Sequence, residues 1–532
     1  MNSAVRPPAR YANEVISGQK GIAQYFWSPN ADGVWYYDCT AVALLVLAFV
    51  WPLSAQSKSN VTVLVSIDSR DNTPIEPGFA GYNVALMSVA FGYRDPRWIA
   101  QVRRLGPGWL RYPAGTRSEA FDWTTGASHQ SWVDTVSRSF SPEVQADFTE
   151  TLQDTMEVLA AKGGEHLDEA AMLARTTRAR GLIVCVNVFT DTPISAKQFA
   201  AYVKRHGIPV LAWELGNEPY FNSKLWPTST AYVNAVRPFA TAIREADPNA
   251  KIGVSMSDAG FADRNWDDLL ASFRPRYWDF IIYHHYPTVG GTPTAMIAAL
   301  NDVLLHRTTD YVRDEVKRRF GPMPIMITEA GPQDGPEPGM SGTMYGGIWS
   351  AEYALRMSSL LQVKHFGIHQ LVGPAGVGVT NSHTHDLINS WKNGERLDIA
   401  PLDFGLYQSA QGAAYSLAAT TINSATTVYR TDIQGGGTAP LPDGKTMSAV
   451  FAETYRVRNQ TVVVLTNKGG RAETVSISMD GHPVQTRFHV VTVSATDPSA
   501  KNAAGRELIA PLASVASGSI LVPPYSVVRI SW

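Results

Sequence analysis

The sequence has little of what marks several protein classes. It contains 2 cysteines in 532 residues, Cys39 and Cys185. Because Cys39 precedes a candidate cleavage site, we expect no internal disulfide in the mature chain. The formal net charge is -2. A chain so balanced has no broad positive field to attract a polyanion, which argues against nucleic-acid binding.

The chain also has no comfortable membrane span. The apolar run 41–51 is too short to cross a bilayer and breaks at Pro52. Leu53-Ser54-Ala55 then offers small residues for cleavage after Ala55, so residues 1–55 are typical of a leader with a secretory signal, although about forty residues precede the apolar run. We expect a secreted protein, extracellular or periplasmic, without a stable membrane partner. The alternative is an uncleaved leader that anchors the chain in the membrane.

What the sequence does contain is ordinary globular material, with 45% hydrophobic and 17% charged residues. From residue 79 short apolar runs alternate with amphipathic segments, which is typical of strand-helix units around a parallel sheet. Eight such runs predict an α/β fold, a (β/α)8 barrel over residues 79–422. The predicted strands are 79–87, 108–116, 181–188, 211–219, 252–256, 278–287, 324–331 and 367–374. The predicted helices are 96–105, 196–206, 229–246, 294–320 and 345–363.

The pattern changes after a helical segment at 408–422. β-rich runs separated by turns such as Gly435-Gly436-Gly437 and Gly469-Gly470 predict an antiparallel β-sandwich over residues 423–532. Residues 56–78 are expected to be a linker with a strand at 61–67 that joins this sandwich. The predicted sandwich strands are 428–433, 447–455, 461–466, 474–479, 488–493 and 520–530.

Two of the predicted barrel strands stop at a glutamate. Glu218 closes the run 211–219 and Glu329 closes the run 324–331. In a (β/α)8 barrel the carboxyl ends of the strands carry the catalytic groups. Two carboxyl groups about 5 to 5.5 Å apart across that mouth are the pair of a retaining glycosidase. We expect Glu218 to be the acid/base and Glu329 the nucleophile of a double displacement at an O-glycosidic bond.

Neighbouring residues are expected to support this pair. Asn217 can donate to the 2-hydroxyl of the sugar, and Arg111 can hold Glu329 ionised through a charge-assisted hydrogen bond. Tyr286, at the end of the sixth run, can donate its hydroxyl to Glu329. Glu214, deeper in the strand of Glu218, is expected to be a buried hydrogen-bonding residue.

Aromatic and histidine side chains complete the candidate site. Sugar rings stack on flat apolar faces, and the candidates are Trp213, Trp226 and Tyr345, with core packing as the alternative for Trp213 and Tyr345. A zinc site needs three or four converging ligands, so His383 and His385 do not predict one. We expect no metal and no cofactor. His284 and His285 are expected to be donors to the substrate or to a tyrosine.

At these residues the chain resembles the clan A glycoside hydrolases, in which Asn-Glu-Pro after strand four carries the acid/base. Within that clan it is most similar to family 79, that of heparanase and microbial β-glucuronidases. The segments that carry this resemblance are 213–219, 283–286, 341–355 and 524–528. The resemblance implies a β-glucuronidase-like enzyme with a (β/α)8 barrel and a β-sandwich. The sequence departs from that family in the loop 373–389, which lacks a tyrosine that holds the sugar carboxylate.

Two alternatives stay open at this point. One is another clan A specificity, such as arabinofuranosidase, xylosidase or glucosidase. The other is a catalytically silent carbohydrate-binding protein that keeps the barrel. In either case the expected partner is an oligosaccharide or glycoside.

Overall fold

The computed structural model describes residues 62–84, 92–257, 265–334, 340–371, 407–503 and 506–532. The predicted leader and the loop 373–389 lie outside these residues. Within the described residues, none of the helices combines the length and apolarity needed to cross a bilayer. Contacts group Asn60–Trp532 into one compact unit, so the predicted division into a barrel and a sandwich domain at 422 stays a prediction.

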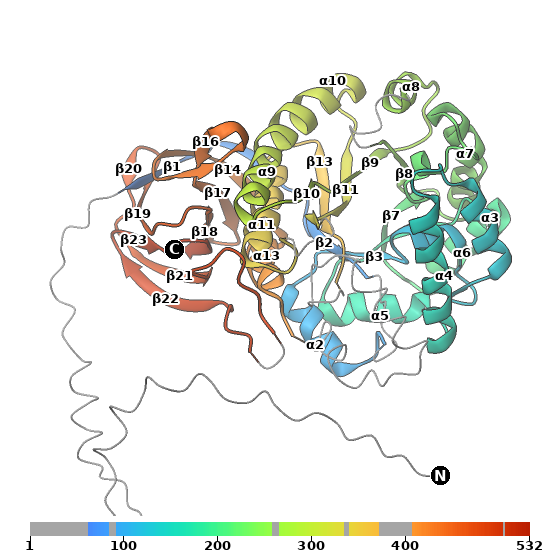
Figure 1. Cartoon of the computed structure of the whole chain (residues 1–532), viewed down its shortest axis with the longest axis horizontal. Helices are drawn as coiled ribbons and strands as arrows, with labels where there is room; N and C mark the ends of the chain where they lie inside the picture. Colours follow the sequence, from blue (N-terminus) through green and yellow to red (C-terminus); the bar gives the residue numbers. More distant parts are fainter. Residues whose placement is uncertain (1–61, 85–91, 258–264, 335–339, 372–406, 504–505) are drawn as a thin grey trace, which may run out of the picture. The chain divides into compact units, whose positions relative to one another are not determined.

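Eight parallel strands close into a barrel, as the eight apolar runs predict (Figure 1). Each strand pairs with the next along the chain, and the eighth pairs with the first. The strands are short and mostly fully buried, which explains their nearly continuous apolar sequences. They are β2 (Ala80–Asn83), β3 (Leu110–Tyr112), β6 (Leu182–Val186), β7 (Val210–Leu215), β8 (Ile252–Ser255), β9 (Phe280–His285), β11 (Ile325–Ala330) and β13 (Val363–Ile368).

Helices follow the strands around the barrel. α2 (Pro96–Leu105) shows how the sequence sets their ends: Asp95 caps the first turn, Pro96 fits the first helical position, and Gly106 adopts the left-handed conformation that ends the helix. The predicted helix 294–320 is α9 (Pro293–Leu305), the π-helical η4 (His306–Val316) and α10 (Lys317–Phe320) in succession. The other helices with ten or more residues are α3 (Gln130–Ser139), α4 (Gln145–Lys162), α5 (Leu167–Thr177), α6 (Pro193–Arg205), α7 (Ser229–Ala246), α11 (Met344–Ser358) and α13 (Ala410–Ser424).

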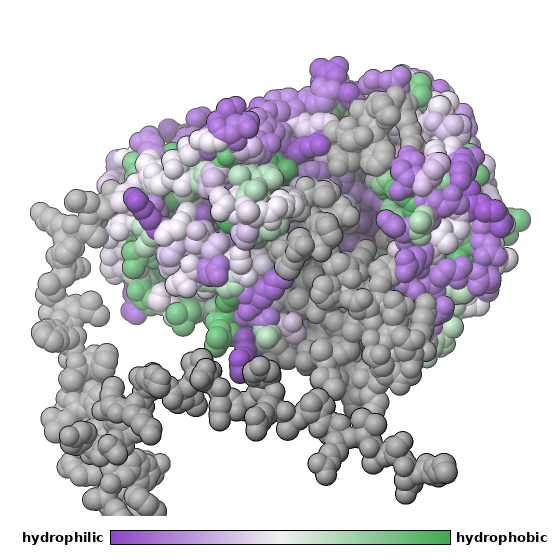
Figure 2. All heavy atoms as spheres, in the orientation of Figure 1, coloured by the Kyte–Doolittle hydropathy of each residue, from purple (hydrophilic) through white to green (hydrophobic). Residues whose placement is uncertain are grey.

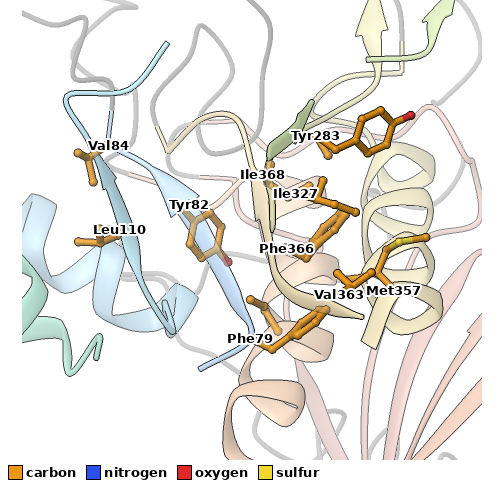
Figure 3. Packing of buried hydrophobic residues seen from close by; sticks show 14 of the residues in the cluster. Phe79, Tyr82, Val84, Leu110, Tyr283, Ile327, Met357, Val363, Phe366 and Ile368 are labelled. Atoms are coloured by element: carbon orange, nitrogen blue, oxygen red, sulfur yellow. The ribbon is translucent and has the colours of Figure 1, made fainter. Parts of the chain in front are cut away.

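The barrel strands and their helices share one large hydrophobic core. Figure 3 shows part of it, where Met357 of α11 lies beside Val363 and Phe366 of β13. Hydrophilic residues cover much of the described surface on the face drawn in Figure 2. The interior of the barrel is therefore closely packed and apolar. Burying a polar group there costs free energy unless the group is hydrogen-bonded or paired with a charge.

Outside the barrel, a 10-stranded, mostly antiparallel sheet surrounds a second core, and the other described strands form two-stranded sheets. As predicted, the strand before the barrel belongs to it: β1 (Val63–Pro74) pairs antiparallel with β14 (Thr427–Gly435) and parallel with β19 (Glu473–Met479). The predicted run 447–455 is divided between two strands, and so is 520–530. β22 (Leu512–Ser517) was not predicted, because its residues are mostly exposed and the segment lacks a marked apolar run. The other strands of this sheet are β17 (Val450–Val457), β18 (Gln460–Asn467), β20 (His482–Pro483), β21 (Arg487–Ser494), β23 (Ile520–Val522) and β24 (Ser526–Ser531).

A buried ion pair joins this sheet to the barrel helices. Lys468 Nζ, just after β18, donates to Glu352 Oε2 of α11 at 2.6 Å, and both side chains are fully buried. Thr466 Oγ1 donates to the same oxygen at 2.7 Å, and Arg356 donates to Oε1. Burial favours the neutral acid, but the charges of Lys468 and Arg356 hold the pKa of Glu352 below its usual value.

Candidate active site

The structure brings Glu218 and Glu329 together at the carboxyl ends of β7 and β11, which β8 and β9 separate in the barrel. Glu329 is the penultimate residue of β11, as predicted. Glu218 lies three residues beyond the end of β7, where the sequence predicted that it would close the strand. The chain leaves the strand there because Gly216 and Glu218 both have positive φ, 85° and 41°. One carboxylate oxygen of each glutamate and one ring nitrogen of His284 lie within 4.8 Å of one another.

Glu329 is buried among hydrogen-bond donors. Nη1 of Arg111 donates to Oε1, and the hydroxyl of Tyr286 donates to Oε2, as the sequence predicted. His369 Nδ1 lies 3.6 Å from Oε2. Burial alone would raise the pKa of Glu329, but the positive charges of His284, His369 and Arg111 outweigh it and hold that pKa well below the usual range. Glu329 is therefore an anion in the resting site.

Arg111 fixes several site residues at once. Its Nε donates to Glu214 Oε2 at 2.6 Å, its Nη1 to Asn83 Oδ1 at 3.0 Å, and its Nη2 to Asn217 Oδ1 at 3.1 Å. Burial disfavours the guanidinium, yet the charges of Glu214 and Glu329 raise the pKa of Arg111 above its ordinary value. With its oxygen held by Arg111, Asn217 leaves Nδ2, which is buried and has no hydrogen-bond partner among the described residues.

Glu218 accepts two hydrogen bonds at the same oxygen. Tyr220 donates its hydroxyl to Oε1 at 2.9 Å, and His284 Nδ1 lies 3.0 Å from Oε1. The other ring nitrogen of His284 lies 3.1 Å from Thr328 Oγ1, which fixes the plane of the imidazole. Burial lowers the pKa of His284, but the charges of Glu329 and Glu218 outweigh it and raise that pKa above the ordinary value. The second oxygen of Glu218 is not engaged by either donor.

Four predicted site residues lie elsewhere. Side chains alternate along a strand, so His285 points away from the mouth that His284 faces. It contacts the Tyr353 hydroxyl at 3.1 Å, and burial lowers its pKa to about 3. The three aromatic candidates are 0% to 5% exposed and pack in the large core, so their rings present no free face to a sugar; they are Trp213, Trp226 and Tyr345. Trp213 and Tyr345 therefore have the alternative role considered from the sequence, which is packing in the core.

Other residues at the mouth were missed by sequence reasoning. His369 follows β13, so the strand-end argument used for the glutamates would have found it. Asn83 ends β2 and could have been found in the same way. Glu119 could not have been found from the sequence. It lies in η1 (Thr116–Ala120), a short turn after β3 whose residues follow neither the strand nor the helix periodicity.

The donor types of Glu218, His284 and Glu329 are also those of a metal site. The permanent positive charge of Arg111 on Glu329 opposes a second cation there. That the site works without a metal stays a prediction.

Comparisons with known proteins come from structures alone. No protein-family model and no curated protein matches the sequence. A GH51 arabinofuranosidase from Xanthomonas axonopodis pv. citri is 14% identical, with a TM-score of 0.64 over 89% of this chain and 100% of that chain. An alpha-L-arabinofuranosidase from Thermotoga maritima is 16% identical, with a TM-score of 0.61 over 88% and 99%. A Paenibacillus polymyxa xyloglucanase from glycoside hydrolase family 44 is 12% identical, with a TM-score of 0.55 over 88% and 99%.

At such identities the similarity concerns the fold. The narrower resemblance to the heparanase and β-glucuronidase family is not shown by these comparisons. The chain has the fold shared by these arabinofuranosidase and family 44 structures, a (β/α)8 barrel with a mostly antiparallel β-sheet domain.

Proposed function

We propose that this protein is a retaining glycoside hydrolase in which Glu329 is the nucleophile and Glu218 the acid/base. The observation that carries the proposal is that one carboxylate oxygen of Glu218 and one of Glu329 lie within 4.8 Å of each other. A retaining enzyme needs its two carboxyl groups about 5 to 5.5 Å apart, whereas an inverting enzyme needs about 6.5 to 9.5 Å to leave room for water. The short separation supports double displacement.

The proposed steps use each carboxylate once in each half of the reaction. Glu329 attacks the anomeric carbon as the glycosidic bond breaks, and Glu218 gives its proton to the departing oxygen. A covalent glycosyl ester of Glu329 forms. Glu218, now ionised, takes a proton from water, the hydroxide adds to the anomeric carbon, and Glu329 leaves as a carboxylate. Two inversions give net retention.

The neighbouring residues fit these steps. Arg111 and Tyr286 stabilise the Glu329 anion before attack and after release. Asn217 Nδ2 is a buried donor without a hydrogen-bond partner among the described residues, although its amide also faces Glu119. It is suited to the 2-hydroxyl of the sugar. His284 binds the proton-transferring residue and not the sugar in this proposal, which departs from the role expected of it from sequence.

For the sugar we favour an arabinofuranoside over the glucuronide expected from the sequence. Two of the solved structures that match nearly their whole length carry the name arabinofuranosidase. A glucuronidase needs a cationic or hydroxyl cradle for the sugar carboxylate, and Arg111 is already taken by Glu214 and Glu329. A β-glucuronide remains the second candidate because the resemblance at 213–219 and 283–286 favours it.

Hydrolysis of nitrophenyl glycosides tests this proposal. The panel consists of the α-L-arabinofuranoside, β-glucuronide, β-xyloside and β-glucoside. Proton NMR identifies the anomeric configuration of the sugar when it is first released. We expect turnover of the arabinofuranoside with retained configuration. Binding of these compounds without turnover of any would favour the silent carbohydrate-binding protein, and an inverted first product would contradict the assigned roles.

A further inference from the structure

Glu119 is a buried glutamate beside the acid/base for which the proposed steps have no use. It is 1% exposed and lies in η1, between the strand that carries Arg111 and the helix α3. Its Oε2 accepts from Asn222 Nδ2 at 3.2 Å, and the same nitrogen donates to Ser139 Oγ at 2.8 Å. Asn222 ends the short turn η2 (Pro219–Phe221) that begins at Glu218.

Glu119 differs in its partners from two other buried glutamates, Glu165 and Glu352. Glu165 has Arg117 and Lys162 at 2.9 Å, and Glu352 has Lys468. Among the described residues Glu119 forms no ion pair with any lysine, arginine or histidine.

The groups that face Glu119 come from several elements and none is an available cation. The turn after β7 supplies the amides of Asn217 and Asn222 and the carboxylate of Glu218, and β11 supplies Glu329. Arg117, two residues earlier, is turned to Glu165 and to the carbonyl oxygen of Pro113. A carboxylate buried among two amides and two other acidic groups is costly, whereas a neutral acid is not.

We propose that Glu119 is a positioning residue that stays a neutral carboxylic acid and, through Asn222, holds the turn on which Glu218 sits. This inference rests on the proposed function where it concerns Glu218. Burial, reinforced by the charges of Glu218 and Glu329, raises the pKa of Glu119 well above the ordinary 4.5, although the amides of Asn222 and Asn217 oppose the rise. A neutral acid keeps its hydrogen bonds without adding a third negative charge to the pair.

The activity test compares Glu119→Ala with Glu119→Gln on the glycoside that the wild type hydrolyses. Loss of the support lets Glu218 shift, and a displacement of about 1 Å costs about 100-fold in rate. We expect Glu119→Ala to lose about that much in kcat with little change in KM, and Glu119→Gln to recover most of it, because the amide is a neutral isostere. A glutamine variant no better than the alanine variant would overturn the proposal.

The second arm measures Tm against pH and needs no substrate, so it separates failure of this inference from failure of the proposed function. A raised pKa in the folded state means that the wild type loses stability as pH rises above 4.5. Glu119→Gln should therefore gain Tm over the wild type increasingly from pH 4.5 to 8. A constant difference over that range would contradict a neutral Glu119, and so would a glutamine variant that does not fold.

Glu165→Gln is the matched control, because Glu165 is equally buried but paired with cations. The charges of Arg117 and Lys162 outweigh its burial and hold its pKa below the ordinary value. Its stabilising effect is present above pH 4.5 and is lost as pH falls, so Glu165→Gln should be less stable than the wild type near neutrality and approach it only in acid. If the Tm difference from the wild type changed with pH in the same way for Glu119→Gln and Glu165→Gln, the proposal that Glu119 is neutral while Glu165 is ionised would be overturned.

Discussion

The hydroxyl of Tyr286 donates a hydrogen bond to Oε2 of Glu329, so one carboxylate oxygen is held by a neutral donor while Arg111 holds the other. Tyr286 itself remains protonated, because burial and the charges of Glu329 and Glu218 raise its pKa well above 10. The donor is therefore available throughout the pH range in which the site can work.

Tyr286→Phe tests the value of this donor. A hydrogen bond to a charged group contributes about 1.5 to 3 kcal/mol, so we expect kcat/KM to fall about 10- to 100-fold. The donor also lowers the pKa of Glu329. Without it that pKa rises, and since Glu329 must be ionised to attack, the acid limb of the kcat/KM profile should move to higher pH. An acid limb that stays in place or moves to lower pH would argue against Glu329 as the group that titrates.

Glu329→Ala should abolish turnover, and added azide should restore it. The small anion enters the space left by the carboxylate and attacks the anomeric carbon once, which gives a glycosyl azide of inverted configuration. NMR of the product reads the anomer directly. Glu473→Ala is a suitable control, because Glu473 is buried in the β-sheet domain and hydrogen-bonded to Gly437 N at 2.9 Å, far from the proposed chemistry. A rescued product of retained configuration would refute the nucleophile.

Glu218→Ala should respond to the leaving group. Substrates with acidic leaving groups need little protonation, so they should lose less rate than substrates with basic ones. Azide should here give a product of retained configuration, because it replaces water in the second step. A series of substituted phenyl glycosides measures this dependence. Equal losses across the series would count against Glu218 as the acid.

Glu352→Gln should destabilise the whole chain without touching the mouth of the barrel. It leaves the buried Lys468 without its counter-charge, which costs about 3 to 5 kcal/mol. Since the pKa of Glu352 is depressed in the folded chain, this loss is full above the ordinary pKa of 4.5 and shrinks as pH falls below it. Urea unfolding at several pH values measures it.

The exposed pair Lys197–Glu245 provides the control for that measurement, because both side chains are about half exposed. Glu245→Gln should change the free energy of unfolding by no more than about 1 kcal/mol. Equal effects of the two substitutions would show that burial of the Glu352 pair contributes nothing.

The sequence predicts most of the fold because barrel strands are buried on both faces. All eight apolar runs overlap barrel strands, although the eighth, predicted at 367–374, shares only its first two residues with β13 (Val363–Ile368). The strand at 61–67 pairs with the C-terminal sheet as expected. β22 could not be predicted in this way, because it is an exposed strand without a run of buried apolar residues. Its Leu512 is 72% exposed. Glu329 could be found from its strand end, whereas the exact turn that carries Glu218 depends on positive φ values that its apolar pattern does not reveal.

Side-chain direction is the part that could not be predicted. Trp213 and Tyr345 belong to segments correctly assigned to a strand and a helix, yet which face they occupy depends on packing against Phe199 in one case and Asn301 in the other. Glu119 lies in a turn without periodicity, and only the fold brings it beside Glu218. Residues placed by non-local contacts leave no local pattern in the sequence.

The most direct measurement is the identification of the covalent intermediate. A 2-fluoro analogue of the hydrolysed glycoside, with a good leaving group, slows the second step and traps the glycosyl ester, since fluorine disfavours the oxocarbenium-like transition state. Mass spectrometry of the digested protein should place the sugar on Glu329, and Glu329→Ala should carry none. A sugar attached to Glu218 or elsewhere, or inactivation without any adduct, would contradict the double displacement at this carboxylate pair.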